Sequence, residues 1–104
     1  LRYLYKCDYV ICLSHLGYQY TNSDRVSDQV IARETVGIDL IIGGHTHTFL
    51  DAPERIKKED GSVTMISQVG FAGVVLGRID VEFDRRNHVL RAFAANHAIT
   101  SDLA

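Results

Sequence analysis

The sequence predicts an α/β fold in which a βαβ unit is followed by antiparallel strands. Two short apolar runs, residues 9–13 and 38–42, lack the polar alternation of a half-exposed strand. Such runs are typical of parallel strands that are buried on both faces. Residues 25–37 lie between them and have helical periodicity, which supplies the crossover of a βαβ unit. Beyond Phe49, turn residues separate shorter runs that are typical of antiparallel strands.

The first strand and the helix are joined by a long loop. The strand "YVICL", residues 9–13, ends before a stretch rich in Gly, Asn, Ser and Asp, which favours loop structure. In the helical segment that follows, an apolar stripe is predicted to face the sheet, and it consists of Val26, Val30 and Ile31. Gly37 is a suitable stop before the second strand, "IDLII".

The second half of the chain is predicted to be an antiparallel meander. Residues 53–69 contain two strands around an Asp60-Gly61 turn. Residues 74–83 alternate between apolar and charged side chains, and residues 89–95 form the last strand. No repeat, linker or low-complexity tract interrupts the sequence, so residues 1–104 are predicted to form a single unit.

Composition excludes several classes of function. The net charge is −2 and no basic run exceeds two residues, so a nucleic-acid-binding surface is not expected. No apolar run is long enough to span a membrane. Cys7 and Cys12 are predicted to be buried free thiols, because strand geometry places them beyond disulfide reach. The opening "LRYLYKCDYV" resembles the end of a helix entering a strand, and Leu1 is not a methionine, so we expect a fragment or processed product.

Three histidines follow the two predicted parallel strands. His15 comes just after the first strand, and His45 and His47 come just after the second, behind Gly43 and Gly44. Carboxyl ends of parallel strands meet at one edge of a sheet, where ligands bind, so we expect these imidazoles to converge. A His-x-His pair in extended chain points both rings the same way. Neighbouring imidazoles are ligands for Zn²⁺, Mn²⁺ or Fe.

The residues alone leave two kinds of metal site open. Three imidazoles suit one catalytic zinc with an open position, or half of a two-metal centre. A two-metal centre needs a bridging carboxylate, whereas Asp8 and Asp39 lie at the amino ends of the strands. His88 and His97 are predicted to be solvated or structural.

"VICLSHLG", "GIDLIIGGHTHT" and the downstream "ISQVGFAGVVLGRIDVEFD" resemble the calcineurin-like metallophosphoesterases, in their 5'-nucleotidase branch. The resemblance covers nearly all of residues 5–85. It implies the second half of a four-layer α-β-β-α sandwich around two divalent metal ions. By this resemblance, His15 and His45 bind one metal and His47 binds the other.

The resemblance also implies what the chain lacks. The Asp-x-His, Gly-Asp and Gly-Asn-His motifs of the family do not occur in these 104 residues. No residue here matches the family's transition-state stabiliser, and no substrate-binding residue is identified. The chain alone is therefore expected to be inactive, and to need the upstream half of the same domain as its partner.

The implied function is metal-dependent hydrolysis of a phosphate ester, with 5'-nucleotidase activity on nucleoside monophosphates as the first hypothesis. Same-fold alternatives are a 2',3'-cyclic phosphodiesterase and a nucleotide-sugar hydrolase. A further alternative, of another class, is a noncatalytic metal-binding or interaction domain. The resemblance implies a periplasmic or cell-surface location.

Overall fold

The computed structural model describes residues 2–101. Leu1, on which the expectation of a fragment rests, lies outside the described residues. Residues 2–5 form turns and a bend rather than the end of a helix. The helix and strands, in chain order, are β1 (Ile11–Leu13), α1 (Asp28–Glu34), β2 (Leu40–Ile42), β3 (Glu54–Lys57), β4 (Val63–Ser67), β5 (Val75–Phe83) and β6 (Val89–Ala98).

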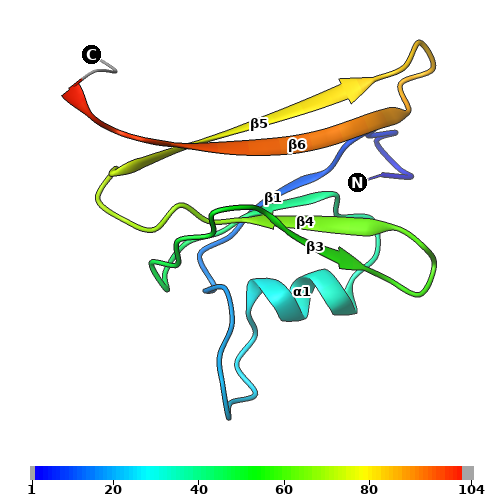
Figure 1. The fold of residues 1–104 in the computed structure, drawn as a ribbon. Coiled ribbons are helices and arrows are strands. Elements are labelled where there is room, and N and C mark those ends of the chain that lie inside the picture. The colour runs from blue at the N-terminus through cyan, green and yellow to red at the C-terminus, as the bar shows by residue number, and fades with distance from the viewer. Residues whose placement is uncertain (1, 102–104) are drawn as a thin grey trace.

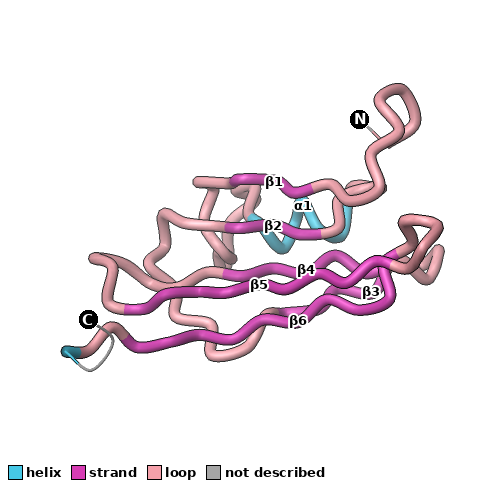
Figure 2. Tube along the Cα trace, turned by 90° about the horizontal axis from the view of Figure 1, so that it is seen from above, coloured by secondary structure: helices cyan, strands magenta, loops and turns pink. Residues whose placement is uncertain are grey.

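The first four strands form one mixed sheet in the order β1-β2-β4-β3. Strand β1 pairs with β2 in parallel, with Ile11 opposite Leu40, which confirms the predicted βαβ unit. Helix α1 lies on one side of this sheet, and a separate β5-β6 ribbon lies on the other (Figures 1 and 2). Phe83 of the ribbon contacts Tyr9, which lies just before β1, in an edge-to-face pair whose ring centroids are 6.2 Å apart.

The predicted meander is wrong for β4. This strand pairs in parallel with β2 and antiparallel with β3, so it belongs to the first sheet. Thr64, Met65 and Ile66 are all 2% exposed or less, as expected for a central strand buried on both faces. The predicted hairpin of β3 and β4 is confirmed, and β5 and β6 form a separate antiparallel ribbon, as alternation predicts. Because β4 is parallel to β1 and β2, its carboxyl end reaches the same edge of the sheet.

Helix α1 is shorter than predicted and buries a different face. It begins after Ser27, whose hydroxyl accepts a hydrogen bond from the Val30 N–H at 3.3 Å and so caps the helix. The buried positions are Asp28 and Ala32, one helical turn apart. Val26, which precedes the helix, is 49% exposed and Val30 is 36% exposed, so the predicted apolar stripe is wrong at these two positions.

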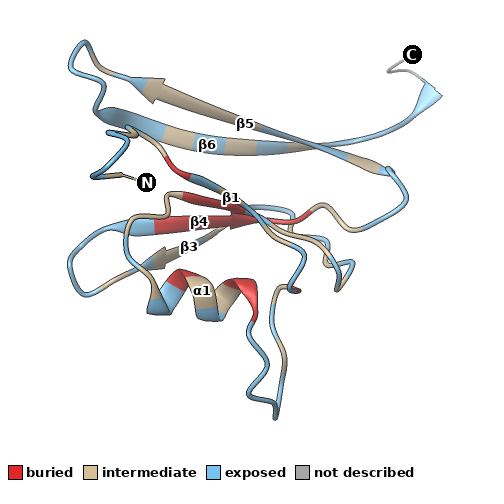
Figure 3. Cartoon of the chain, turned by 180° about the vertical axis from the view of Figure 1, so that it is seen from behind, coloured by how far each residue is buried: buried red, intermediate tan, exposed pale blue. Residues whose placement is uncertain are grey.

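The hydrophobic core is small and lies between α1 and the sheet (Figure 3). Its buried centre is Ala32, Ile41 and Ile66. Strand β1 is an edge strand, and the prediction that it is buried on both faces is wrong, since Ile11 is 51% and Leu13 80% exposed. Cys7 and Cys12 are free thiols, as predicted, but both are half-buried rather than fully buried.

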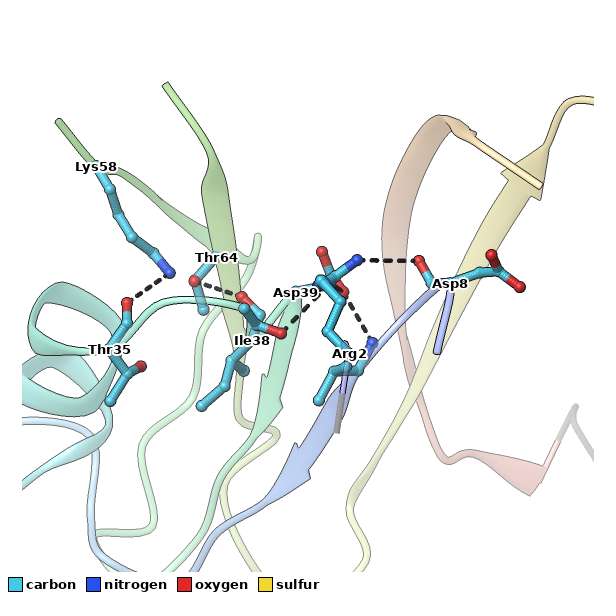
Figure 4. Close-up of polar contacts among 9 residues, drawn as sticks. Arg2, Asp8, Thr35, Ile38, Asp39, Lys58 and Thr64 are labelled. Atoms are coloured by element: carbon cyan, nitrogen blue, oxygen red, sulfur yellow. Dashed lines mark hydrogen bonds and ion pairs between the residues drawn. The ribbon is translucent and has the colours of Figure 1, made fainter. Parts of the chain in front are cut away.

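The amino ends of the parallel strands are held by structural polar contacts (Figure 4). Asp39 pairs with Arg2 and accepts a hydrogen bond from the Val10 N–H at 2.8 Å. Thr64, at the amino end of β4, donates to the Ile38 carbonyl at 2.7 Å. Asp39 therefore stabilises the end of the sheet opposite the histidines. Within residues 2–101, no helix has the length and apolar character needed to cross a membrane.

Candidate metal-binding site

The carboxyl ends of β1, β2 and β4 lie side by side, and we call this edge of the sheet the histidine edge. Hydrogen bonds continue past the strands: the Ser14 N–H donates to the Ile42 carbonyl, and the Gly43 N–H donates to the Ser67 carbonyl, both at 2.9 Å. The loops that carry the histidines therefore leave the sheet together. This arrangement follows from the parallel pairing of the three strands.

The histidine edge brings His15 and His45 together. Their ring centroids are 5.2 Å apart, with an interplanar angle of 71°. Both side chains are exposed to solvent. A Cβ atom at Gly44 would lie 3.2 Å from Nδ1 of His15, so glycine leaves room for the imidazole ring. The predicted convergence of these two histidines is confirmed, and two adjacent imidazoles suit a shared metal ion.

The His-x-His segment is not extended, so that prediction is wrong. His45 has a φ of 77° and His47 a φ of 52°, both in the left-handed region that side chains rarely adopt. The Thr46 N–H donates to the Gly44 carbonyl at 3.0 Å, which makes His45 the central residue of a γ-turn. Such a backbone costs roughly 1–3 kcal/mol and persists only where surrounding contacts enforce it.

His47 is placed differently from the other two histidines. Its ring stacks on Phe71, with centroids 5.0 Å apart and planes 22° apart. Within residues 2–101, no group of three or more His, Cys, Asp and Glu side chains is arranged to hold a metal ion. The pair of His15 and His45 thus fits two ligand positions rather than a complete set. His47 as a ligand stays a prediction.

The other two histidines lie outside this site. His88 is in the β5-β6 turn, exposed, with its Nδ1 3.5 Å from a carboxylate oxygen of Asp84. His97 is an exposed residue of β6, opposite Leu76 of β5. Both positions agree with a solvated or structural role.

Sequence reasoning missed two buried polar residues behind the histidine edge. Asp28 is 0% exposed, and its Oδ1 accepts a hydrogen bond from the Ser14 hydroxyl at 2.5 Å. Burial raises the pKa of the Asp28 carboxyl, and the Ser14 hydrogen bond partly opposes that shift. Gln68, just past β4, is 2% exposed, and its Oε1 accepts from the Thr48 N–H at 2.7 Å. Gln68 would have been found from the sequence if β4 had been recognised as a parallel strand.

Comparison with known proteins gives a consistent set of relatives. The trifunctional nucleotide phosphoesterase protein YfkN of Bacillus subtilis (strain 168) is 39% identical over 84 residues, which are 81% of this chain and 5% of that protein. A snake venom 5'-nucleotidase of Gloydius brevicauda is 31% identical over 96 residues, 80% of this chain and 15% of its own length. No protein-family model matches the chain.

A solved structure shares the fold. The crystal structure of a 5'-nucleotidase precursor from Thermus thermophilus matches with a TM-score of 0.77 and 26% identity, over 99% of this chain and 21% of that one. The chain therefore has the fold of a metallophosphoesterase. With its sequence relatives, this places the chain in the 5'-nucleotidase branch of the metallophosphoesterase superfamily. It spans 5–21% of the length of the three proteins it matches here.

Proposed function

We propose that this chain supplies half of the metal-binding site of a phosphohydrolase that acts on nucleotides, with 5'-nucleotidase activity on nucleoside monophosphates as its main reaction. The observation that carries the proposal is the pairing of His15 and His45, 5.2 Å apart, at the carboxyl ends of parallel strands. The relatives named as 5'-nucleotidases and as a nucleotide phosphoesterase support the substrate class.

In this proposal, His15 and His45 hold one divalent ion through ring nitrogens, and His47 turns from Phe71 to hold a second. Zn²⁺, Mn²⁺ and Fe all accept imidazole ligands. Two such ions, when bound, polarise phosphoryl oxygens and lower the pKa of water for an in-line attack. The two exposed imidazoles place the reacting phosphate outside the sheet, above the histidine edge.

The chain is proposed to act as the C-terminal half of a metallophosphatase domain. Strand β1 is at the edge of its sheet, and its exposed Ile11 and Leu13 offer an apolar surface to another part of such a domain. The family's Asp-x-His and Gly-Asn-His motifs, absent from these residues, belong to that upstream half. A bridging carboxylate and the stabilising histidine would come from there.

An extracytoplasmic location, periplasmic or at the cell surface, is part of the proposal. It is supported only by the relatives, among which are enzymes named as snake venom 5'-nucleotidases.

Calorimetric titration of the 104-residue chain with Zn²⁺ and with Mn²⁺ tests the proposed site. Wild type is expected to bind weakly, because bridging and supporting groups typically change metal affinity by about 10–100-fold. His45→Ala is expected to abolish this binding. His88→Ala is the matched control, because it removes an exposed imidazole far from the histidine edge.

Activity is tested with the gene product that carries this segment, on p-nitrophenyl phosphate and on a nucleoside monophosphate. His45→Ala is expected to lose most turnover, while His88→Ala retains it. Full activity of the His45 variant would refute the metal assignment. Strong hydrolysis by the 104 residues alone would show that the site is not divided as proposed.

A further inference from the structure

Two buried polar atoms meet at Gly43, directly behind the histidine edge. Within residues 2–101, Oδ2 of Asp28 and Nε2 of Gln68 are fully buried and have no hydrogen-bond partner. A Cβ atom on Gly43 would lie 2.0 Å from that Asp28 oxygen and 3.3 Å from that Gln68 nitrogen. Both groups therefore pack against the backbone of Gly43, which leads from β2 into the His45 turn.

The second polar atom of each side chain binds a histidine-bearing loop. Oδ1 of Asp28 accepts from the Ser14 hydroxyl, and the Ser14 oxygen accepts from the Leu16 N–H at 3.2 Å. These contacts hold the backbone on both sides of His15. The loop is anchored by residues that come from the start of helix α1 as well as from the sheet.

Gln68 does the same for the second loop. Its Oε1 accepts from the Thr48 N–H at 2.7 Å and from the Thr46 hydroxyl at 3.4 Å. The Thr46 hydroxyl oxygen also accepts from the Tyr18 N–H at 3.0 Å, which ties the His45 loop to the chain that follows His15. The two loops are thus joined to each other and to two buried side chains.

We propose that Asp28 and Gln68 are positioning residues that set the separation of the His15 and His45 rings, and through it the metal affinity of the histidine edge. The inference rests on the proposed metal-binding function. A buried polar atom without a partner is unfavourable, and an apolar side chain of similar size would avoid it. Gln68 also binds Thr46 and Thr48 beside the γ-turn at His45, whose strained backbone needs surrounding contacts.

The test uses two readouts on the 104-residue chain. The first is the NMR cross-peak between ring protons of His15 and His45, measured without metal. The second is Zn²⁺ affinity by calorimetry. Gln68→Leu keeps the approximate size and removes both hydrogen-bonding ends, so we expect loss of the cross-peak and a drop in affinity of about 10–100-fold.

Thr64→Val is the matched control. Thr64 is 0% exposed, lies on strand β4, which ends just before Gln68, and makes its hydrogen bond to Ile38 at the opposite end of the sheet (Figure 4). It removes a buried side-chain hydrogen bond, as Gln68→Leu does, but away from the histidines. The cross-peak and the affinity are expected to stay at wild-type values.

A reciprocal exchange provides rescue. Gln68→Glu alone places two carboxylates beside Gly43 and is expected to weaken the cross-peak. Adding Asp28→Asn returns one carboxylate and one amide to the same space and keeps the acceptors for Ser14 and Thr48, so the cross-peak is expected to return. If far-UV circular dichroism shows that Gln68→Leu does not fold, the Gln68→Glu variant and the exchanged double variant still test the proposal.

Each outcome decides the proposal. A wild-type cross-peak and affinity in Gln68→Leu would overturn it, as would equal losses in Thr64→Val or a failure of rescue in the exchanged pair. If wild type binds no Zn²⁺ but only Gln68→Leu loses the cross-peak, the positioning role stands and the proposed metal site fails.

Discussion

Gly43→Ala probes the tightest approach behind the histidine edge. The added Cβ would lie 2.0 Å from Oδ2 and 3.1 Å from Cγ of Asp28, so the carboxylate must move. That carboxylate is 0% exposed and is held by the Ser14 hydroxyl, so it has little room to do so. The clash therefore disturbs packing and a charged hydrogen bond together.

The expected loss of stability follows from the packing clash and the weakened hydrogen bond. Overpacking a core costs about 1–3 kcal/mol, and a hydrogen bond to a charged group is worth about 1.5–3 kcal/mol. The terms overlap, because one movement relieves the clash and lengthens the bond, so we expect Gly43→Ala to cost about 2–4 kcal/mol. Domains have a total stability of roughly 5–15 kcal/mol, so the loss is measurable by urea unfolding followed by circular dichroism.

A double-mutant cycle with Asp28→Ala isolates the cause. Without the carboxylate, the new methyl group meets no such obstacle, and Gly43→Ala should cost less by about 1–3 kcal/mol. Gly61→Ala is the control, because a Cβ at this distant turn contacts nothing within 4 Å. Its effect should add to that of Asp28→Ala within about 0.5 kcal/mol. If Gly43→Ala costs the same with and without Asp28, the carboxylate does not lie against Gly43.

Two further predictions concern the neighbouring side chains. Because burial raises the pKa of Asp28 above its ordinary 3.8, the folded chain binds this proton more tightly than the unfolded chain does. The stability that this group contributes is therefore lost as pH rises from the unfolded to the folded pKa. Across that window, urea titrations should show the free energy of unfolding of wild type falling relative to that of Asp28→Asn. Parallel curves of stability against pH would contradict this. Phe71→Ala removes the stack on His47, worth about 0.5–1.5 kcal/mol, so calorimetry should show Zn²⁺ affinity rising roughly two- to tenfold if His47 is a ligand. A fall in affinity would show that the stack supports the site instead.

The pairing of His15 with His45 could be predicted because it depends only on strand direction. Two apolar runs joined by a helical crossover must be parallel, and parallel strands carry their following loops to the same edge. No knowledge of side-chain packing was needed. The same reasoning failed for β4 because its hairpin with β3 indicated antiparallel pairing, and the second, parallel partner of β4 leaves no local signal.

The missed carboxylate has a different cause. Asp28 follows the capping residue Ser27, where an acidic side chain is common because it favours the helix dipole. That local explanation is sufficient, so nothing in the sequence suggests that Asp28 is buried against the loops that follow β1 and β2. Its burial depends on Gly43, which is separated from it by the helix and β2. Contacts of this kind are set by tertiary packing and cannot be obtained from periodicity.

The adjacent residues Gly43 and Gly44 belong to one motif but have different structural roles. In the sequence, Gly43 and Gly44 differ only in that one precedes the other ahead of His45. In the structure, Gly44 leaves space for the ring of His15, whereas Gly43 leaves space for Asp28 and Gln68 on the buried side. A substitution at Gly44 should therefore displace an exposed imidazole that can swing into solvent, while one at Gly43 displaces buried groups that cannot. The exposed and the buried sides of the turn are thus governed by different residues, although they are neighbours in the chain.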